Sequence, residues 1–332
     1  MSVADIRNMV LLGHIGSGKT TFCEALALKT GVINKLGSVE AGNSLSDFTP
    51  EEVQRKTTMY AKPLSGDCKT KSGKPVSLTV IDTPGVDDFA GHVITALKVS
   101  DIAVIMVDAS SGIQVGTNKA WRRCVNEASP RAIVVTGLDK ENASYEKTVS
   151  AIREVWGNSC IPFVYPKAGL EGLIDVLASK DIPEELAGSV EEAKGEIVEF
   201  AAETDDSLLE KYLGGEELAP DEIASGAKAA ICDGRLIPIF PVVPTKGIGI
   251  DEFVENVQRL FPSPLERQHK DAEGNVIDAS ENAPFTGLVW RVATDPYAGK
   301  LAYLRVFGGT LNADDEVFNS AKDAKERLSG IS

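Results

Sequence analysis

The sequence predicts an α/β protein with a mainly parallel sheet, helices on both of its faces and a phosphate-binding loop. Short apolar strands alternate with helices along most of the chain, as in sheets whose parallel strands are joined by crossover helices. A glycine-rich turn at residues 13–18 joins the first strand to the first helix. Near the end of the chain the pattern changes to strands separated by glycines, so a second, all-β part is expected.

The first part of the sheet is predicted from mainly apolar runs and the helices between them. The strands are expected at residues 8–12, 76–81, 102–107 and 132–135, and the helices at 19–29, 114–126 and 145–156. Continuous apolar runs are typical of strands that are buried on both faces of a parallel sheet. These strands therefore form the expected core.

Three acidic helices interrupt this alternation before its last strand and helix. They are expected at residues 191–203, 206–212 and 220–231, and the strand and helix that follow at 237–243 and 250–261. Prolines at 262 and 264 end the last helix. We therefore expect one domain at 1–265 with an inserted subdomain at about 160–234, and then a polar linker at 266–283.

The segment at residues 284–332 predicts the start of a β-barrel domain. Strands are expected at residues 288–292, 301–307 and 316–319, with glycines between them. So short a segment cannot close a barrel of the usual size. We expect the chain to stop inside this second domain, as the N-terminal part of a longer protein.

Composition predicts a cytoplasmic protein with reduced thiols. The chain is 43% hydrophobic and 25% charged, which is ordinary for a globular protein. No apolar run is long enough for a membrane span, and the first residues lack the layout of a signal peptide. The five cysteines are scattered without a C-x-x-C pair, so we expect no disulfide framework and no zinc site. We expect no membrane partner and a monomer.

The net charge of −15 is unevenly distributed. Residues 181–234 contain sixteen acidic and three basic residues and carry −13 of that charge. This window cannot lie on a phosphate backbone, which requires lysine and arginine, and we expect no DNA partner. It is either a solvated face that favours solubility or a docking surface for a protein that carries lysines.

Residues 13–20 match the phosphate-loop pattern G-x-x-x-x-G-K-[ST]. They are Gly13, His14, Ile15, Gly16, Ser17, Gly18, Lys19 and Thr20, and Thr21 follows as a further candidate contact. Glycines allow backbone N–H groups to turn toward phosphates, and the N-terminus of the following helix attracts anions. We expect Lys19 to reach the β- and γ-phosphates and the Thr20 hydroxyl to bind Mg²⁺.

Two further segments complete the predicted phosphate and magnesium site. Asp82-Thr83-Pro84-Gly85 follows the strand at 76–81, so Asp82 is expected to hold Mg²⁺ through water and Gly85 to offer its N–H to the γ-phosphate. This tetrapeptide is also a favourable turn, but after a phosphate loop it is a strong signal. Thr58 is expected to close over the Mg²⁺ and the γ-phosphate. Thr57, or a threonine that merely begins a strand, is the alternative.

A carboxylate follows the strand at 132–135 at the place where a base would be recognised. Asp139 can accept hydrogen bonds from both N1–H and N2–H₂ of guanine, whereas adenine presents an acceptor at N1. Thr245 and Lys246, after the strand at 237–243, are expected to form the rest of the base side. The nucleotide expected from these residues is GTP or GDP.

The order of these segments resembles translational GTPases and most closely resembles elongation factor G. The further segments that carry the resemblance are Gly172-Leu173-Ile174-Asp175, Lys211-Tyr212-Leu213-Gly214-Gly215-Glu216-Glu217, Pro262-Ser263-Pro264-Leu265, Asp295-Pro296-Tyr297-Ala298-Gly299-Lys300-Leu301 and Gly309-Thr310-Leu311. The resemblance covers nearly the whole chain and implies a P-loop GTPase domain, GTP, Mg²⁺ and a conformational switch. It also implies a ribosomal partner, both rRNA and the stalk protein, with the acidic insert at 181–234 contacting the latter.

The chain departs from that family at several functional positions. The family has Asp where this chain has Gly16, and a water-positioning histidine where it has Val86. A valine can neither orient nor deprotonate water. The family's Asn-Lys before the base-recognition aspartate is replaced by Thr136-Gly137, so we expect weaker guanine binding. Divergent elongation factor G-like paralogues, which share the Gly-Ser-Gly-Lys-Thr loop, resemble this chain more.

Three functions are compatible with these residues. The first is a slow GTPase stimulated by a ribosome-like partner, in which the catalytic positions are Lys19, Thr58, Gly85 and Val86. The second is a nucleotide-gated binding module that hardly hydrolyses GTP, because of Val86. The third is a P-loop ATPase or kinase, which the altered base loop permits but Asp139 disfavours.

Overall fold

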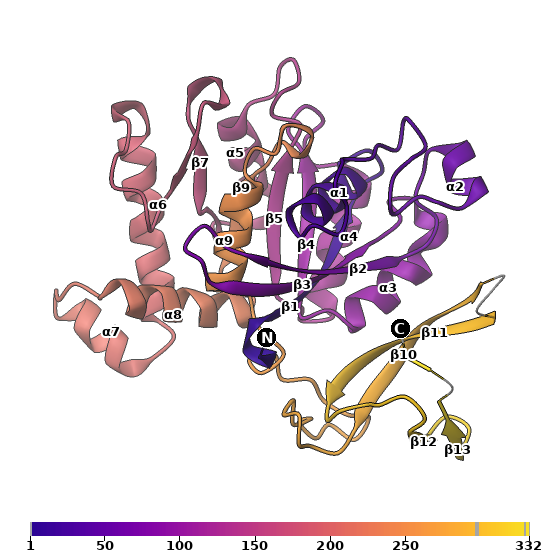
Figure 1. The fold of residues 1–332 in the computed structure, drawn as a ribbon. Coiled ribbons are helices and arrows are strands. Elements are labelled where there is room, and N and C mark those ends of the chain that lie inside the picture. The colour runs from indigo at the N-terminus through magenta and orange to yellow at the C-terminus, as the bar shows by residue number, and fades with distance from the viewer. Residues whose placement is uncertain (1, 296–298, 329, 332) are drawn as a thin grey trace. The chain divides into compact units, whose positions relative to one another are not determined.

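The chain divides into two units in the computed structural model, which describes residues 2–295, 299–328 and 330–331. The first unit spans residues 1–266 and the second 267–332. Among the described residues, no helix has both the length and the apolar composition needed to cross a membrane. The first unit contains the predicted phosphate loop and is the larger of the two (Figure 1).

Seven strands of the described part of the first unit form one sheet in the order β2-β3-β1-β4-β5-β9-β6. Their bounds are β1 Ile6–Gly13, β2 Lys62–Lys69, β3 Pro75–Asp82, β4 Ile102–Asp108, β5 Arg131–Thr136, β6 Cys160–Pro162 and β9 Ile237–Pro241. The pairs from β3 to β6 are parallel, and β2 pairs antiparallel with β3 at the edge. The mainly parallel sheet that the sequence predicts is therefore confirmed.

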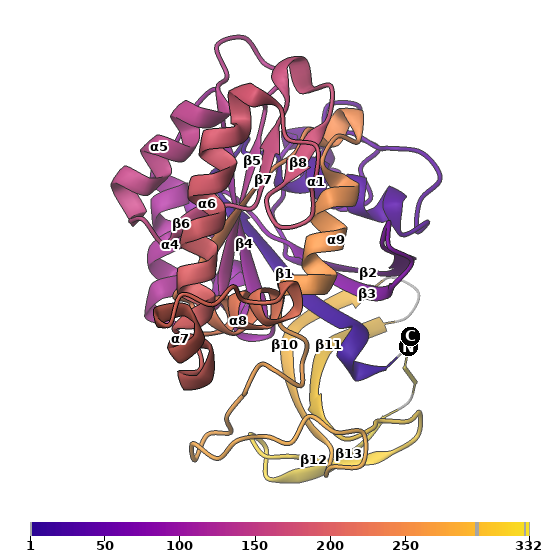
Figure 2. The same ribbon diagram turned by 90° about the vertical axis from the view of Figure 1, so that its left-hand side faces the viewer.

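Helices cover both faces of this sheet. The helices of the first unit outside the insert are α1 Lys19–Lys29, α2 Pro50–Arg55, α3 Ala90–Lys98, α4 Val115–Asn126, α5 Tyr145–Trp156 and α9 Ile250–Leu260. Helices α1 and α9 lie on one face, and α4 and α5 on the other (Figure 2). All seven residues of the central strand β4 are buried, as expected of a strand with both faces covered.

The carboxyl ends of three parallel strands meet at one edge of the sheet. Strand β1 ends at Gly13, β3 at Asp82 and β5 at Thr136. In parallel sheets the loops that follow the carboxyl ends of the strands gather at one edge, where ligands bind. The predicted phosphate, magnesium and base-recognition segments therefore come together through the topology alone.

The insert consists of a short hairpin and three helices, which α9 supports. Its elements are β7 Val164–Pro166, β8 Leu173–Asp175, α6 Glu184–Ala202, α7 Asp206–Leu213 and α8 Pro220–Cys232. Asp175, at the end of the hairpin, accepts hydrogen bonds from Asn256 at 2.9 Å and from Arg259 at 2.9 Å on α9. Gly226 of α8 packs so closely on α6 that a Cβ there would lie 2.5 Å from the Ala201 carbonyl oxygen.

Most elements predicted for the first unit are found with ends shifted by one or two residues. The predicted start of the first insert helix is wrong, since α6 begins at Glu184 rather than at 191. Its early part buries Leu186 and Val190, four residues apart on one helical face. The prediction lacks β2 because the strand alternates buried and partly exposed residues at the sheet edge, without an apolar run.

In its described residues, the second unit consists of one long and one short pair of antiparallel strands. Strand β10 Thr286–Asp295 pairs with β11 Gly299–Gly308, and β12 Glu316–Asn319 pairs with β13 Ala324–Arg327. The strands predicted at 288–292 and 301–307 are found and extend by one to three residues at each end. Part of the family-like segment at 295–301, namely residues 296–298, lies outside the described residues.

Candidate nucleotide-binding site

The phosphate loop contains three glycines with positive φ, and at Gly13 a side chain would also collide with β4. Gly13 has φ +145°, and a Cβ on it would lie 2.7 Å from the Met106 carbonyl oxygen of β4. Gly18 precedes α1 in the left-handed conformation, at φ +85°. The backbone of the loop can therefore turn toward the positive end of α1, where phosphates bind. Gly16 has φ +78°, but a Cβ there would meet nothing within 4 Å.

Lys19 is buried inside this loop, with a side chain that faces the loop's own carbonyls. Its Nζ donates to the carbonyl oxygens of Gly13 at 3.1 Å and His14 at 2.8 Å. Burial lowers the pKa of Lys19 to about 8, although the carboxylates of Asp82 and Asp47 raise it. A buried ammonium held by carbonyls gains most from an anionic ligand, because the ligand restores the charge balance.

The segment after β3 closes against the phosphate loop. A Cβ on Gly85 would lie 2.7 Å from Nζ of Lys19 and 2.7 Å from the backbone nitrogen of Ile15. Residue 85 must therefore be glycine if the two loops are to approach this closely. The predicted γ-phosphate contacts, Lys19 and Gly85, are adjacent in the structure.

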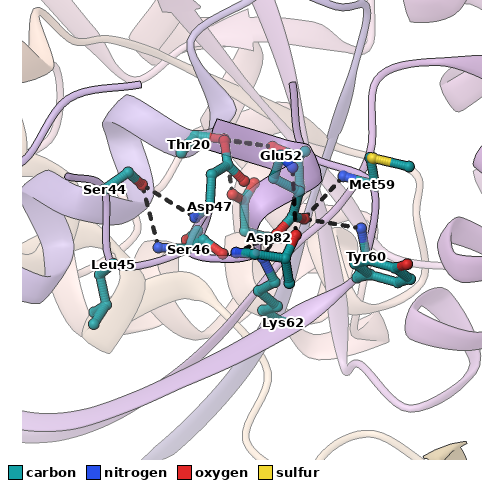
Figure 3. Close-up of polar contacts among 12 residues, drawn as sticks. Thr20, Ser44, Leu45, Ser46, Asp47, Glu52, Met59, Tyr60, Lys62 and Asp82 are labelled. Atoms are coloured by element: carbon teal, nitrogen blue, oxygen red, sulfur yellow. Dashed lines mark hydrogen bonds and ion pairs between the residues drawn. The ribbon is translucent and has the colours of Figure 1, made fainter. Parts of the chain in front are cut away.

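Thr20, Thr58 and Asp82 meet in one buried contact. The Thr20 hydroxyl donates to Asp82 at 2.8 Å (Figure 3). It also lies 3.0 Å from the Thr58 hydroxyl. Burial raises the pKa of Asp82 to about 6; the hydrogen bond from Thr20 opposes that rise, and the charge of Asp47 adds to it. Thr57, the alternative to Thr58, is only partly buried and donates to the Arg55 carbonyl at 3.2 Å. Thr58 is the one beside Thr20.

Asp47 is a further member of this site that sequence reasoning does not identify. The Thr58 hydroxyl donates to its carboxylate at 3.2 Å, and only 2% of Asp47 is exposed. Asp47 and Asp82 each keep one buried carboxylate oxygen without a hydrogen-bond partner among the described residues. Asp47 lies in a segment without helical or strand periodicity, so the one available signal is a carboxylate shortly before Thr58.

The hydroxyls and carboxylates at this point suit Mg²⁺. The donors are all oxygens, the type that Mg²⁺ prefers, and two of the carboxylate oxygens have no hydrogen-bond partner within the described chain. In the described part of the chain, no three His, Cys, Asp or Glu side chains are grouped as a metal site. An ion here would take the rest of its coordination from water and phosphate oxygens, as Mg²⁺ commonly does.

Two buried glutamates fix the segment that carries Asp47 and Thr58. Glu24 of α1 accepts hydrogen bonds from the Gly37 N–H at 3.1 Å, from the Ser44 hydroxyl at 3.0 Å and from the Leu45 N–H. Glu52 of α2 accepts from the N–H groups of Met59 at 3.0 Å and Tyr60 at 3.3 Å and pairs with Lys62 of β2 (Figure 3). The segment is thereby tied to α1 on one side and to the sheet edge on the other.

No histidine takes the place of the family's water-positioning residue at Val86 in the described structure. Val86 borders a small void of about 10 Å³. The ring of His92, on α3, packs edge-on against Tyr60 with centroids 5.5 Å apart. His14 faces α4 instead, where a Cβ on Gly116 would lie 2.6 Å from its Nδ1.

The base side of the site begins at Thr136, which braces the phosphate loop. Its hydroxyl donates to the Ser17 carbonyl at 2.9 Å, so the threonine that replaces the family's asparagine supports the loop. Asp139 lies 3.5 Å from Lys246, and both line a cavity of about 690 Å³. Thr245 lies beside Lys246 in an exposed 3-10 turn, and Thr21 is partly exposed on the first turn of α1.

The buried charge of Asp82 is expected to lower the free energy of unfolding when neither nucleotide nor Mg²⁺ is bound. The folded-state pKa of about 6 exceeds the ordinary 3.8, so the folded state binds more protons and stability falls as pH rises from about 4 to 6. Asp82→Asn removes this penalty, and we expect the free energy of unfolding at pH 7.5 to rise by about 1–3 kcal/mol. Denaturant unfolding of the parent and the variant at pH 5 and 7.5 measures this difference, which should be smaller at pH 5. A variant less stable than the parent at pH 7.5 would contradict this.

Comparison with known proteins agrees with this geometry. The family model "Elongation factor Tu GTP binding domain" matches residues 4–263. A crystal structure of a Thermus thermophilus protein superposes with a TM-score of 0.85 at 32% identity and covers 98% of this chain. This chain spans about half of that protein's chain, or 48%. The chain therefore belongs to the translational GTPases that share the elongation factor Tu GTP-binding domain.

Proposed function

We propose that this chain is the GTP-binding and GTP-hydrolysing N-terminal part of an elongation factor G-like protein that acts on the ribosome. The observation that carries the proposal is the buried contact of Thr20 with Asp82 and Thr58, beside the buried Lys19. These groups come from three separate segments, and together they offer a cation to a phosphate and oxygen ligands to a metal ion.

The residues have distinct roles in this proposal. Backbone N–H groups at the start of α1 hold phosphate oxygens, and Lys19 neutralises the charge of the β- and γ-phosphates. The hydroxyls of Thr20 and Thr58 and the carboxylates of Asp82 and Asp47 would hold Mg²⁺. When bound, Mg²⁺ would supply positive charge to the phosphate oxygens. Gly85 offers its N–H to the γ-phosphate, so the segment after β3 differs between the GTP and GDP states.

Asp139 selects guanine in this proposal. Its carboxylate accepts two hydrogen bonds from the guanine edge and would repel the acceptor at N1 of adenine. Lys246, 3.5 Å from Asp139, then covers one side of the base together with Thr245. Binding is expected to be weaker than in relatives with a lysine at position 137.

We also propose the division of the chain into functional parts. Residues 1–265 form the GTP-binding domain with an inserted subdomain at about 160–234, residues 266–283 a linker, and 284–332 the start of a β-barrel domain. Helices α6, α7 and α8 carry most of the acidic residues of the insert, so a lysine-bearing stalk protein is the partner of that face. We propose rRNA as the other ribosomal partner of the protein, outside the acidic insert.

Val86 supports a second candidate function, a nucleotide-gated binding module. A valine at this position leaves the attacking water without a side chain to orient it. The contacts of Thr58 and Gly85 would still respond to the γ-phosphate, so binding could switch a partner surface without hydrolysis. A P-loop ATPase or kinase is less well supported, because Asp139 disfavours adenine.

Lys19→Ala tests the proposed GTPase directly. We expect ribosome-stimulated GTP turnover to fall by about 10²- to 10³-fold, because the phosphate charge loses its buried cation. Lys29→Ala is the matched control: this lysine is on the same helix but pairs with Asp251 at 2.6 Å, and its loss should leave turnover unchanged. Turnover by Lys19→Ala equal to the parent's would refute the assignment.

Val86→His separates the two leading functions. If the native protein is a gated module crippled at this position, a histidine should raise ribosome-stimulated hydrolysis by about 10²-fold or more. Val86→Phe controls for ring size without a nitrogen and should give no increase. A Val86→His protein with unchanged turnover, in parallel with an active parent, would show that this chain positions water by another group.

A further inference from the structure

The turn that carries Asp139 is closed by its own backbone. The Lys140 N–H donates to the Gly137 carbonyl at 3.1 Å, so Leu138 and Asp139 occupy the two central positions. Gly137 begins the turn in the left-handed conformation, at φ +67°. The direction of the Asp139 carboxylate is therefore set by how the two corners of this turn, Gly137 and Lys140, are held.

Both corners of the turn lie against a single carboxylate, that of Asp108. Asp108 ends β4 and lies opposite Thr136 in the parallel register with β5. A Cβ on Gly137 would lie 2.8 Å from its Oδ2, and the same oxygen accepts the ion-pair hydrogen bond from Lys140. The other oxygen accepts from the Ser110 N–H at 2.9 Å and the Ser111 N–H at 3.2 Å.

Asp108 is buried and charged, so its stability in the folded protein depends on its partner Lys140. Its side chain is 5% exposed, whereas that of Lys140 is 53% exposed. Burial tends to raise the pKa of Asp108, but hydrogen bonds from Lys140 and Ser110 outweigh it and hold the pKa below its usual value. Without Lys140, Oδ2 would face Gly137 as a buried anion without a cation, and the turn would have to move.

We propose that Asp108 and Lys140 form a positioning pair that holds the turn so that Asp139 faces the guanine edge. The pair provides a cation at the base loop where position 137 has none. Position 137 cannot easily carry a lysine, because its φ is positive and its Cβ direction is filled by Asp108. This inference rests on the proposed guanine binding and assigns to it two residues that do not touch the base.

The test compares GDP with inosine diphosphate by calorimetric titration of the full chain with Mg²⁺. Inosine lacks the N2 amino group, so the ratio of the two Kd values measures one of the two contacts with Asp139. We expect Lys140→Ala to raise the Kd for GDP about tenfold and to bring the ratio toward one. Lys140→Arg should restore both values, since arginine keeps the ion pair. Lys71→Ala, which removes a pair of similar exposure with Glu252, should change neither.

A double-mutant cycle completes the test. Asp108→Asn is nearly isosteric and should raise the Kd for GDP as Lys140→Ala does, and the double variant should be no worse than either single one. Additive effects would overturn the proposal, as would a Lys140→Ala protein that melts earlier but keeps the parental ratio. If the parent binds no GDP, the proposed function fails and this inference with it. If the parent binds and the variants match it, the inference alone fails.

Discussion

The buried contact of Thr20 with Asp82 and Thr58 joins the three segments on which the site depends. Thr20 lies in the first turn of α1, Asp82 ends β3, and Thr58 comes from the segment that α2 and β2 hold in place. Parallel pairing of β1 with β3 brings the first two together, and Glu24 and Glu52 bring the third. The rest of the first unit, including the glycines of the loops, can be understood as what allows this contact to form.

Three charged side chains are buried at this contact, at a cost to the stability of the folded protein. Lys19, Asp47 and Asp82 are each almost fully buried, and burial moves the pKa of Lys19 down to about 8 and that of Asp82 up to about 6. Such groups lower the stability of the free protein, and the binding of opposite charges restores it. Functional sites commonly carry this kind of local cost, which the surrounding structure tolerates. In the proposed base-recognition turn, buried Asp108 is likewise paired with a cation, Lys140.

The central sheet and the phosphate loop are predictable from the sequence, because local pattern determines both. Apolar runs mark β1, β3, β4 and β5, and Lys19 and Asp82 follow their strands at motif spacing. Asp47, Glu24 and the pair of Asp108 with Lys140 are not predictable in this way. Each acts through a partner on another segment, with no periodicity to mark it: Asp47 meets Thr58 from the other end of α2, and Lys140 meets Asp108 across two strand ends. The edge strand β2 escapes prediction for the related reason that it is half exposed.

The most direct test of the nucleotide site is a calorimetric titration of the chain with GDP, GTP and ATP, each with Mg²⁺ and repeated in its absence. We predict binding of GDP and GTP that weakens markedly when Mg²⁺ is removed, and ATP binding weaker by about 100-fold or more, since a base-recognition site rejects an analogue that leaves its buried polar groups unpaired. Equal binding of ATP and GTP would show that Asp139 does not select the base. Absence of binding by all three nucleotides would contradict the central claim that Lys19, Thr20, Thr58 and Asp82 form a nucleotide site.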